Sequence, residues 1–389
     1  THTHTHTHKR ANAPRRPAHL HTLSHTHTLP MDRISAISAA AAGNGESQPP
    51  TCSGKAYHLK QCCMVDSGVI VATALDARGS LKDKLEKAGK RNFTSNELET
   101  FKLIVTKYLS TLSSGMLLDL KYATNARKFI ARTKSCGLLL AYEAGSKKDG
   151  PPPLTEDWSA DRIKKEGGNG VKLLVYFNPE WPQDRIKSTQ AFVEKVGIEC
   201  KSTGVPFFLE ILTLDEKTKG KGNGLAYARK KPEMVLEATR EFSNPKYCAD
   251  ILKMEFPVIP AFVSGLKANE TKSHHGNFAY TTEEAKRHLQ EMSRVAKVPF
   301  IFLSAGVDMT MFLEMLTLAG QSKCQFSGVL CGRATWKDAV KVFANDGEKA
   351  LEEWVSTKGI KNLKALKDVL QSHATSVKVM SPHFPSSTL

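Results

Sequence analysis

Val171–Asn178 (Val-Lys-Leu-Leu-Val-Tyr-Phe-Asn) leads through the amphipathic stretch Trp181–Thr203 to Pro206–Thr213 (Pro-Phe-Phe-Leu-Glu-Ile-Leu-Thr). Both short runs are almost continuously apolar, which is typical of strands buried on both faces of a sheet. Parallel neighbours need a crossover connection, and the intervening stretch is long enough to supply one as a helix. This part of the sequence therefore predicts a strand–helix–strand unit of a parallel sheet.

The same alternation of short apolar runs and longer amphipathic stretches continues from about Val65 onward. The eight runs are Gly68–Asp76, Gly115–Leu120, Gly137–Glu143, Val171–Asn178, Pro206–Thr213, Ile251–Val258, Pro299–Gly306 and Phe326–Arg333. The helix-like segments between them include Asn96–Ser110, Trp181–Thr203, Pro232–Ser243, Thr281–Ala296 and Thr310–Ala319. Thr281 and Glu284 have the spacing of a capping box, which favours a helix start there. Eight such units predict an α/β fold, a closed (β/α)8 TIM barrel, with two closing helices in Lys337–Gln371.

The first 50 residues differ in character from the rest of the chain. Thr1–His8 is a Thr-His repeat, a second His-Thr run spans His25–Thr28, and the segment up to Pro50 is rich in Ala, Ser, Gly and Pro. We interpret residues 1–50 as a low-complexity, disordered leader and residues 51–389 as one barrel domain with its closing helices. Translated leader ahead of Met31 is the favoured explanation; a metal-binding tail and an organelle transit peptide are the alternatives.

Composition excludes several classes of protein. Of the 389 residues, 40% are hydrophobic and 24% are charged, as expected for a soluble globular protein. No apolar run approaches the roughly 20 residues that cross a bilayer, so no membrane association is predicted. The net charge of +16 comes from scattered basic residues, which indicates a solvated surface that attracts doubly anionic substrates rather than nucleic acid. The sequence leaves open whether the protein forms a homo-oligomer.

The cysteines predict neither a metal centre nor a disulfide framework. The eight cysteines lack metal-ligand spacing, and we expect no secretory signal. Reduced thiols in the cytoplasm are therefore expected.

Polar residues cluster where the predicted strands end. In a (β/α)8 barrel, reactive groups lie at the C-terminal ends of the strands. A single polar residue there is often solvated or caps a helix, whereas convergence of several on one rim favours an active site. The strand-end residues are Asp76, Arg78, Asp119, Glu143, Ser304, Gly306, Gly332 and Arg333.

Two lysines interrupt the apolar runs. Lys253 lies in Ile-Leu-Lys-Met-Glu-Phe-Pro-Val, and Lys172 lies in Val-Lys-Leu-Leu-Val-Tyr-Phe. Loss of hydration disfavours an ammonium group and so lowers the pKa of a buried lysine, and a second cation nearby acts in the same direction. A neutral amine can attack a ketone carbonyl. The alternative is that both side chains point outward beneath helices, with their amino groups reaching water.

Glu210, in Pro-Phe-Phe-Leu-Glu-Ile-Leu, raises the same question for a carboxylate. A carboxylate inside a barrel strand needs a cation or hydrogen-bond donors. Beside a lysine it could relay protons during formation and dehydration of a carbinolamine, or it could simply neutralise a buried ammonium. Glu255 would face the same side of its strand as Lys253, so a second carboxylate role is also open.

The turns after the seventh and eighth predicted strands suggest a phosphate site. They read Ser304-Ala305-Gly306-Val307 and Cys331-Gly332-Arg333. Barrels commonly bind phosphate at this position through backbone N–H groups, a hydroxyl and a cation. Glycine lets the backbone approach the anion, and an arginine can bind it with two parallel hydrogen bonds. Ser304, Gly306, Gly332 and Arg333 are the predicted phosphate-binding residues.

Six segments of the sequence form a recognisable set: Thr73–Leu81, Cys136–Glu143, Pro206–Thr213, Asp250–Val258, Leu303–Val307 and Phe326–Trp336. Together they resemble a known family, the tagatose 1,6-bisphosphate aldolases of the bacterial lactose pathway. The resemblance runs from about residue 65 to about residue 375. It implies a class I (β/α)8 aldolase that uses no metal and no cofactor, and that cleaves its sugar phosphate to dihydroxyacetone phosphate and glyceraldehyde 3-phosphate.

The resemblance also implies roles for single residues. Lys253 matches the Schiff-base lysine, Glu210 the acid/base carboxylate, and Lys172 the lysine beside them, a cation that would favour the neutral amine of Lys253. The expected substrate-binding residues are Asp76, Arg78, Ser304, Gly332 and Arg333.

Two departures from the family pattern concern the substrate more than the reaction. Ala77 stands where the family usually has Gln, and Asp119–Ala123 (Asp-Leu-Lys-Tyr-Ala) stands where the family usually reads Asp-Pro-Glu-Tyr-Gly. An amide donor is lost and one rim charge is reversed. A sulfonated ketose 1-phosphate and fructose 1,6-bisphosphate therefore remain alternative substrates. A barrel that binds sugar phosphates without turning them over is the alternative from another functional class.

Overall fold

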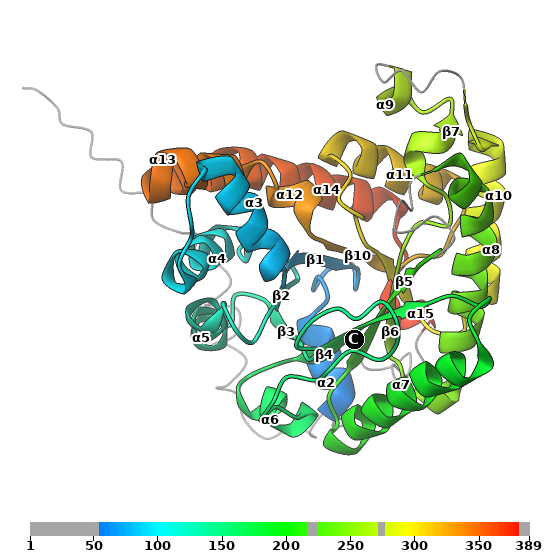
Figure 1. Ribbon diagram of the computed structural model, residues 1–389, viewed down its shortest axis with the longest axis horizontal. Coiled ribbons are helices and arrows are strands. Elements are labelled where there is room, and N and C mark those ends of the chain that lie inside the picture. Colours follow the sequence, from blue (N-terminus) through cyan, green and yellow to red (C-terminus); the bar gives the residue numbers. More distant parts are fainter. Residues whose placement is uncertain (1–53, 216–223, 271–276, 381–389) are drawn as a thin grey trace, which may run out of the picture. The chain divides into compact units, whose positions relative to one another are not determined.

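Eight parallel strands form a closed barrel in the computed structural model, which describes residues 54–215, 224–270 and 277–380 (Figure 1). The order around the barrel is β1-β10-β9-β6-β5-β4-β3-β2. The strands are β1 (Ile70–Leu75), β2 (Gly115–Leu118), β3 (Gly137–Ala141), β4 (Gly170–Phe177), β5 (Phe207–Thr213), β6 (Ile251–Met254), β9 (Phe300–Phe302) and β10 (Gly328–Cys331). Seven of the predicted apolar runs contain one of these strands and the eighth, Val171–Asn178, covers all of β4 except its first residue, Gly170, so the predicted TIM barrel is confirmed. The predicted leader, residues 1–50, lies outside the described residues.

Helices surround the barrel on its outer face (Figure 1). They are α3 (Gly79–Gly89), α4 (Ser95–Leu109), α5 (Thr124–Thr133), α6 (Ala160–Lys165), α7 (Gln183–Thr203), α8 (Leu225–Phe242), α10 (Thr282–Val295) and α11 (Met309–Gln321). The capping box at α10 is confirmed, because Thr281 Oγ1 accepts from Glu284 N at 3.2 Å and Glu284 Oε2 accepts from Thr281 N at 2.8 Å. The predicted start of α8 at Pro232 is wrong: the helix begins at Leu225 and contains the proline. Proline is most common in the first turn of a helix, so it hid the helical residues before it.

The predicted closing helices are also confirmed. They are α13 (Ala339–Trp354) and α14 (Ile360–His373), joined by the π-helical turn Val355–Gly359. A single turn, α12 (Arg333–Trp336), precedes them and follows β10 directly. Arg333 therefore lies at the end of a barrel strand, where a substrate-binding residue is expected.

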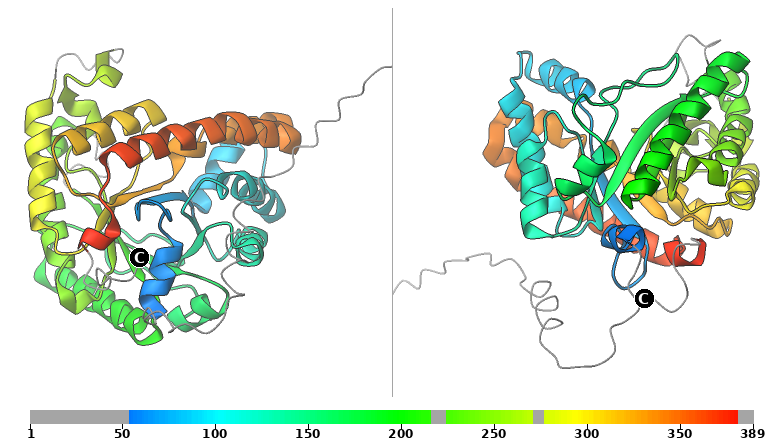
Figure 2. Two further views of the ribbon diagram at one scale, coloured as in Figure 1. Left: turned by 180° about the vertical axis from the view of Figure 1, so that it is seen from behind. Right: turned by 90° about the horizontal axis from the view of Figure 1, so that it is seen from below.

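A helix that the sequence analysis did not predict, α2 (Gly54–Gln61), covers the lower end of the barrel next to α15 (Val377–Met380) (Figure 2). Lys55 Nζ lies 2.8 Å from Asp250 Oδ2, and Ser114 Oγ donates to Cys62 O at 2.7 Å. The helix buries only two residues, Ala56 and Leu59, so its sequence shows no clear apolar face.

Side chains alternate between two cores along each barrel strand, as the period of two requires. In β4, Val171, Leu173, Val175 and Phe177 join the core beneath the helices. The inner core fills the lower barrel and is made of Ile70, Ala72, Ala74, Leu117, Leu139, Ala141, Phe208, Ile251, Ile301 and Leu330, with Ala56, Leu59, Cys62, Cys63 and Val377 below them. The even-numbered residues of β4, including Lys172, therefore face the inside of the barrel.

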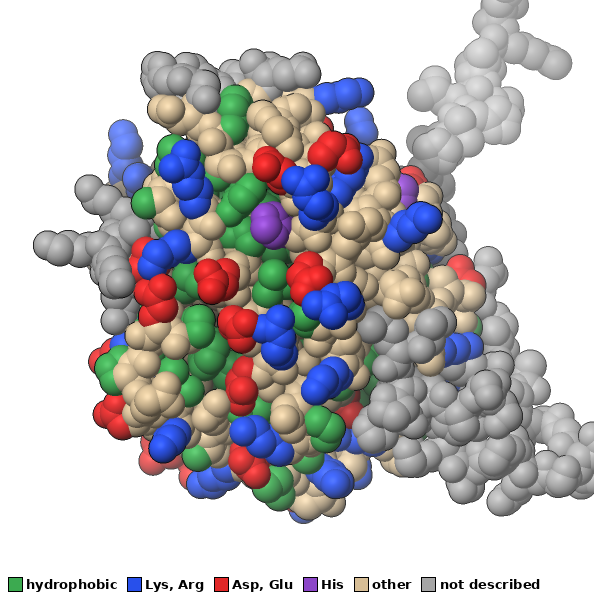
Figure 3. All heavy atoms as spheres, turned by 90° about the vertical axis from the view of Figure 1, so that its right-hand side faces the viewer, with side chains coloured by type: hydrophobic (Ala, Val, Ile, Leu, Met, Phe, Trp, Pro, Cys, Tyr) green, Lys and Arg blue, Asp and Glu red, His purple; other side chains and the backbone are tan. Residues whose placement is uncertain are grey.

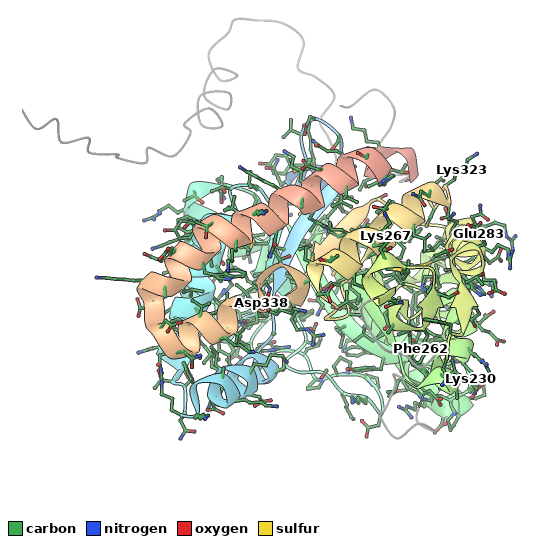
Figure 4. The ribbon with its side chains drawn as sticks, turned by 90° about the horizontal axis from the view of Figure 1, so that it is seen from above. Lys230, Phe262, Lys267, Glu283, Lys323 and Asp338 are labelled. Carbon is green, nitrogen blue, oxygen red and sulfur yellow. The ribbon has the colours of Figure 1, made fainter. Side chains whose placement is uncertain are left out.

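Between β6 and α10 the chain forms a small excursion with β7 (Val263–Ser264), α9 (Lys267–Glu270) and β8 (Tyr280–Thr281). Phe262 and Lys267 mark it in Figure 4, on the same side of the molecule as Lys230 of α8 and Glu283 of α10. The amide of Asn269 donates to Pro260 O and Val263 O at 2.7 and 2.9 Å, which holds the excursion together.

Basic and acidic side chains are interleaved on the face shown in Figure 3. On α10, Lys286 pairs with Glu283 at 2.7 Å and Arg294 pairs with Glu291 at 2.6 Å. This face therefore carries ion pairs rather than an unbroken basic patch. Within the described parts of the chain, no helix is long and apolar enough to cross a membrane.

The contact between α2 and the barrel predicts a stability effect. A Cβ atom on Gly137 would lie 2.6 Å from Gln61 O and 2.8 Å from Cys62 Sγ. We expect Gly137→Ala to lower the free energy of unfolding by about 1–3 kcal/mol, because the added methyl group overpacks the junction. The measurement is urea denaturation, with Gly145→Ala, whose Cβ would meet nothing within 4 Å, as the control. Equal stability of the two variants would contradict the packing described.

Candidate active site

Lys172 lies at the centre of a cluster of charges inside the barrel. Its Nζ is 2.9 Å from Asp76 Oδ2, 2.7 Å from Glu143 Oε1 and 2.8 Å from Glu210 Oε2. Only 2% of its side chain is exposed. The three carboxylates come from the ends of β1 and β3 and from β5. The alternative that Lys172 points outward beneath a helix is therefore wrong.

Lys253 shares one of these carboxylates. Glu210 and Lys253 are register partners on β5 and β6, and Lys253 Nζ lies 2.9 Å from Glu210 Oε2. Lys253 also faces inward, with 5% of its side chain exposed. A single oxygen of Glu210 thus lies between two amino groups, and the three predicted catalytic residues form one cluster.

The charges around Lys172 reverse the pKa shift expected from burial. Burial alone would lower the pKa of its ammonium group, but Asp76, Glu143 and Glu210 together raise the pKa well above its ordinary value. The expectation of a lowered pKa is therefore wrong for this lysine. Lys172 is a fixed cation of the site.

The carboxylates of the cluster differ in their protonation behaviour. Burial works to raise the pKa of Asp76, but Lys172, Lys253 and Arg78 outweigh it and hold that pKa well below its usual range. Burial raises the pKa of Glu143 above its ordinary value, with Lys172 opposing it. Asp76 therefore stays ionised more readily than Glu143, and Glu143 is the carboxyl group of the two that takes up a proton more readily.

Glu143 was absent from the predicted set of catalytic and substrate-binding residues. Its Oε2 accepts a hydrogen bond from Leu174 N at 3.1 Å, and Arg78 Nη1 donates to its backbone oxygen at 2.6 Å. Glu143 therefore connects Arg78 to Lys172 across the mouth of the barrel. The available signal was its place at a strand end, which it shares with many helix-capping residues.

Two other carboxylates near strand ends have structural partners. Asp119 is fully buried in an ion pair with Lys102 of α4, and it accepts hydrogen bonds from Lys121 N and Tyr122 N. Asp119 thus joins β2 to the helical layer. Its expected place among the rim residues is not borne out by these contacts.

Glu255 of the segment after β6 links β5 to α8 through hydrogen bonds. It accepts from Thr213 N and from Lys231 Nζ, both at 2.7 Å. These contacts explain a buried carboxylate two residues after Lys253 in structural terms.

The predicted phosphate-binding turns meet at the rim. Gly306 has φ +82, and a Cβ atom there would lie 2.7 Å from Arg333 Cζ, so the guanidinium packs directly against the glycine. Ser304 is buried, and its backbone oxygen accepts from Val307 N at 3.0 Å to close the turn. Gly332 lies against Ala74 O of β1, where a Cβ would be 3.5 Å away. The structure thus brings together residues from the turns after β9 and β10.

The positions that depart from the family pattern also lie near the mouth. Ala77 is half-buried beside Asp76, whereas Lys121 is exposed and its Nζ lies 5.0 Å from the centre of the Tyr122 ring.

Over residues 54–215, 224–270 and 277–380, no group of three or more His, Cys, Asp or Glu residues is arranged to hold a metal ion.

Comparison with known proteins identifies the family. The sequence model of the family described as DeoC/LacD family aldolase matches residues 70–338 of this chain. The chain belongs to this family. It is therefore an aldolase, a carbon–carbon lyase, and the expected enzyme class is confirmed.

Relatives of this DeoC/LacD family aldolase include tagatose 1,6-diphosphate aldolases. Those from Listeria innocua serovar 6a and Listeria monocytogenes serotype 4a are 43% identical over 313 residues, which cover 79% of this chain and 89% of theirs. The Staphylococcus aureus protein is 39% identical over 317 residues, which cover 80% and 94%. The resemblance found in the sequence is thereby confirmed.

A solved structure, a fructose-bisphosphate aldolase from Plasmodium falciparum, matches with a TM-score of 0.60. The match covers 85% of this chain and 98% of that one at 13% identity. A likeness at this level supports the fold alone.

The charge cluster predicts a pH-dependent loss of stability in Lys172→Met. Removing the cation leaves buried carboxylates facing one another, and we expect a loss of roughly 3–5 kcal/mol at pH 7. In the unaltered protein, the lowered pKa of Asp76 gives stability that is present above the unfolded-state value and is lost as pH falls. In the variant, protonation relieves repulsion as pH falls. The difference in free energy of unfolding between the unaltered protein and Lys172→Met should therefore be smaller at pH 4 than at pH 7.

Denaturant unfolding at several pH values measures this effect. The control is Lys165→Met, which removes an exposed ion pair with Asp161 and should change stability by less than about 0.5 kcal/mol. A loss in Lys172→Met that is small, or that does not vary with pH, would contradict the description of the cluster.

Proposed function

We propose that the protein is a class I aldolase that cleaves tagatose 1,6-bisphosphate to dihydroxyacetone phosphate and glyceraldehyde 3-phosphate through a Schiff base on Lys253. The observation that carries the proposal is Glu210 Oε2, 2.9 Å from Lys253 Nζ and 2.8 Å from Lys172 Nζ inside the barrel. The names of the Listeria and Staphylococcus relatives support the substrate.

The first half of the reaction uses this shared carboxylate. Because Lys172 holds its positive charge against Glu210, that carboxylate stabilises a second ammonium on Lys253 less than a carboxylate of its own would. Glu210 accepts a proton from Lys253, and the neutral amine attacks the C2 carbonyl of the ketose. The same carboxyl group then returns a proton to the carbinolamine hydroxyl, so that water leaves and the protonated imine forms.

The second half of the reaction uses the imine as an electron sink. A base removes the proton from the C4 hydroxyl, the C3–C4 bond breaks, and glyceraldehyde 3-phosphate leaves. The remaining enamine is protonated and hydrolysed to dihydroxyacetone phosphate. In this proposal Asp76 and Arg78 contact the substrate, Ser304, Gly306, Gly332 and Arg333 bind a phosphate group, and no cofactor or metal takes part.

A specific observation keeps alternative substrates in view. Lys121 exposes a positive charge beside the end of β2, and Ala77 offers no hydrogen-bonding side chain. A sulfonated ketose 1-phosphate or fructose 1,6-bisphosphate would place a different group near these residues. The buried Lys172–Glu210–Lys253 cluster argues against a barrel that binds sugar phosphates without turnover, since binding alone does not require two adjacent buried lysines.

We also propose the setting in which the enzyme works. Residues 51–389 would form the aldolase domain and residues 1–50 a leader outside it. The relatives' alignments of 313 to 317 residues support a domain of this extent. The proposed location is the cytoplasm, and the proposed partner is a sugar-phosphate substrate, with neither nucleic acid nor membrane and with a homo-oligomer as an open alternative.

Borohydride reduction in the presence of dihydroxyacetone phosphate tests the Schiff base. We expect peptide mass analysis to find the reduced adduct on Lys253. The adduct should disappear in Lys253→Met and persist in the control Lys230→Met, which alters an exposed lysine paired with Glu180. No adduct on the unaltered protein would overturn the proposal. If an adduct forms but tagatose 1,6-bisphosphate is not cleaved, the substrate assignment fails and the two alternative sugars are assayed.

A further inference from the structure

Two neighbouring residues stand out among the strands of the barrel. All positions of β1 to β6, β9 and β10 are buried except Tyr176 and Leu212, which are partly exposed. Tyr176 and Leu212 are also register partners on β4 and β5. An exposed pair within an otherwise buried barrel marks the place where its interior opens to solvent.

Tyr176 faces that opening from directly above the catalytic cluster. It lies four residues after Lys172 on β4, so both side chains point to the inside of the barrel. Leu174, the inward residue between them, is the register partner of Glu210. Tyr176 is therefore the next inward position above the level of Glu210, roughly 6.6 Å further along the strand. A three-carbon unit attached to Lys253 must extend from the cluster toward this level.

The hydroxyl group of Tyr176 carries its proton at neutral pH and is therefore in the form that can act as a proton donor. Burial raises the pKa of Tyr176 above its ordinary value, with Glu210 and Glu255 acting in the same direction, so the phenol is protonated at neutral pH. Ser146 makes a side-chain hydrogen bond that lowers the pKa, as a donor to the phenol oxygen does. A hydroxyl group that lowers the pKa of the phenol stabilises the oxygen once the proton has left.

Glu210 is less well placed for the same step. One of its oxygens is held between the amino groups of Lys172 and Lys253, at the level of the imine nitrogen. The carbon that must be protonated after C3–C4 cleavage lies two bonds beyond that nitrogen, on the side of the mouth. A donor above the cluster reaches it more directly than a carboxylate within the cluster.

We propose that Tyr176 is a further catalytic residue, which donates the proton to C3 of the enamine after the first product has left. The electron pair of the C2–C3 double bond forms the new C3–H bond, the phenol O–H bond breaks, and the enamine nitrogen becomes the iminium. The resulting phenolate, stabilised by Ser146 and by the charge of Lys172, recovers a proton from water. Leu212 forms the apolar wall beside it. This inference rests on the Schiff base proposed above.

The test compares Tyr176→Phe with Tyr108→Phe, which removes the hydroxyl of a half-buried tyrosine on α4 outside the barrel. Three quantities are measured on the full chain. They are the borohydride-trapped adduct on Lys253, the exchange of the C3 proton of dihydroxyacetone phosphate in deuterated water, and the pre-steady-state release of glyceraldehyde 3-phosphate from tagatose 1,6-bisphosphate.

For Tyr176→Phe we expect an unchanged adduct and proton exchange slowed by about 100-fold, the usual contribution of one acid–base group. A burst of one glyceraldehyde 3-phosphate per site should precede slow turnover, because C–C cleavage proceeds and the enamine accumulates. Tyr108→Phe should behave like the unaltered protein.

The possible results separate the two proposals. If the unaltered protein shows no borohydride-trapped adduct on Lys253, the Schiff-base proposal itself is overturned. Exchange that is unchanged in Tyr176→Phe overturns the role of Tyr176 while leaving the Schiff base intact. Exchange and first-turnover cleavage that fall together, without a burst, show that the tyrosine only shapes the site, and this result also overturns the proposal.

Discussion

The ammonium group of Lys172, held by three carboxylates inside the barrel, is the interaction on which the site depends. A buried charge is tolerated only when it is paired and hydrogen-bonded. Lys172 meets this requirement by donating hydrogen bonds to Asp76 and Glu143 and by pairing with Glu210, and these three residues come from three different strands or strand ends. Its contacts therefore join the ends of β1 and β3 to β5 at the mouth of the barrel.

The same cluster links stability to chemistry. Glu210 is needed to balance Lys172, yet it also lies 2.9 Å from Lys253 Nζ, so the carboxylate that stabilises one lysine is available for proton transfer to and from the other. Arg78 extends the cluster through Glu143. Polar groups here have defined partners because the lower barrel is filled with apolar side chains and closed by α2. The proposed binding and proton transfer would therefore take place at the open end.

The sequence predicted the barrel well because its strands are buried on both faces, and continuous apolar runs of that kind are hard to mistake. Local signals failed where few apolar residues or a proline obscured them, as in α2 and at the start of α8. The protonation of Lys172 could not be predicted for a different reason. Its burial is visible in the apolar run around it, but its partners lie far away in the chain and only the closed barrel brings them together.

The site residues show the same division. Lys253, Glu210 and Lys172 stood out because each is a charge within an apolar strand, and the structure brings all three together. Asp119 and Glu143 both follow strands, where the inward and outward alternation ends, so the sequence could not distinguish them. The structure places Asp119 against Lys102 beneath the helices and Glu143 against Lys172 in the mouth. Only three-dimensional pairing separates the structural carboxylate from the one in the site.

A crystal structure of the protein soaked with dihydroxyacetone phosphate tests the central claim most directly. The account predicts continuous electron density between Lys253 Nζ and C2 of the ligand, with Glu210 beside the new bond and the phosphate against Gly306 and Arg333. A ligand bound in the mouth without a covalent bond to Lys253, or attached to a different lysine, would contradict it.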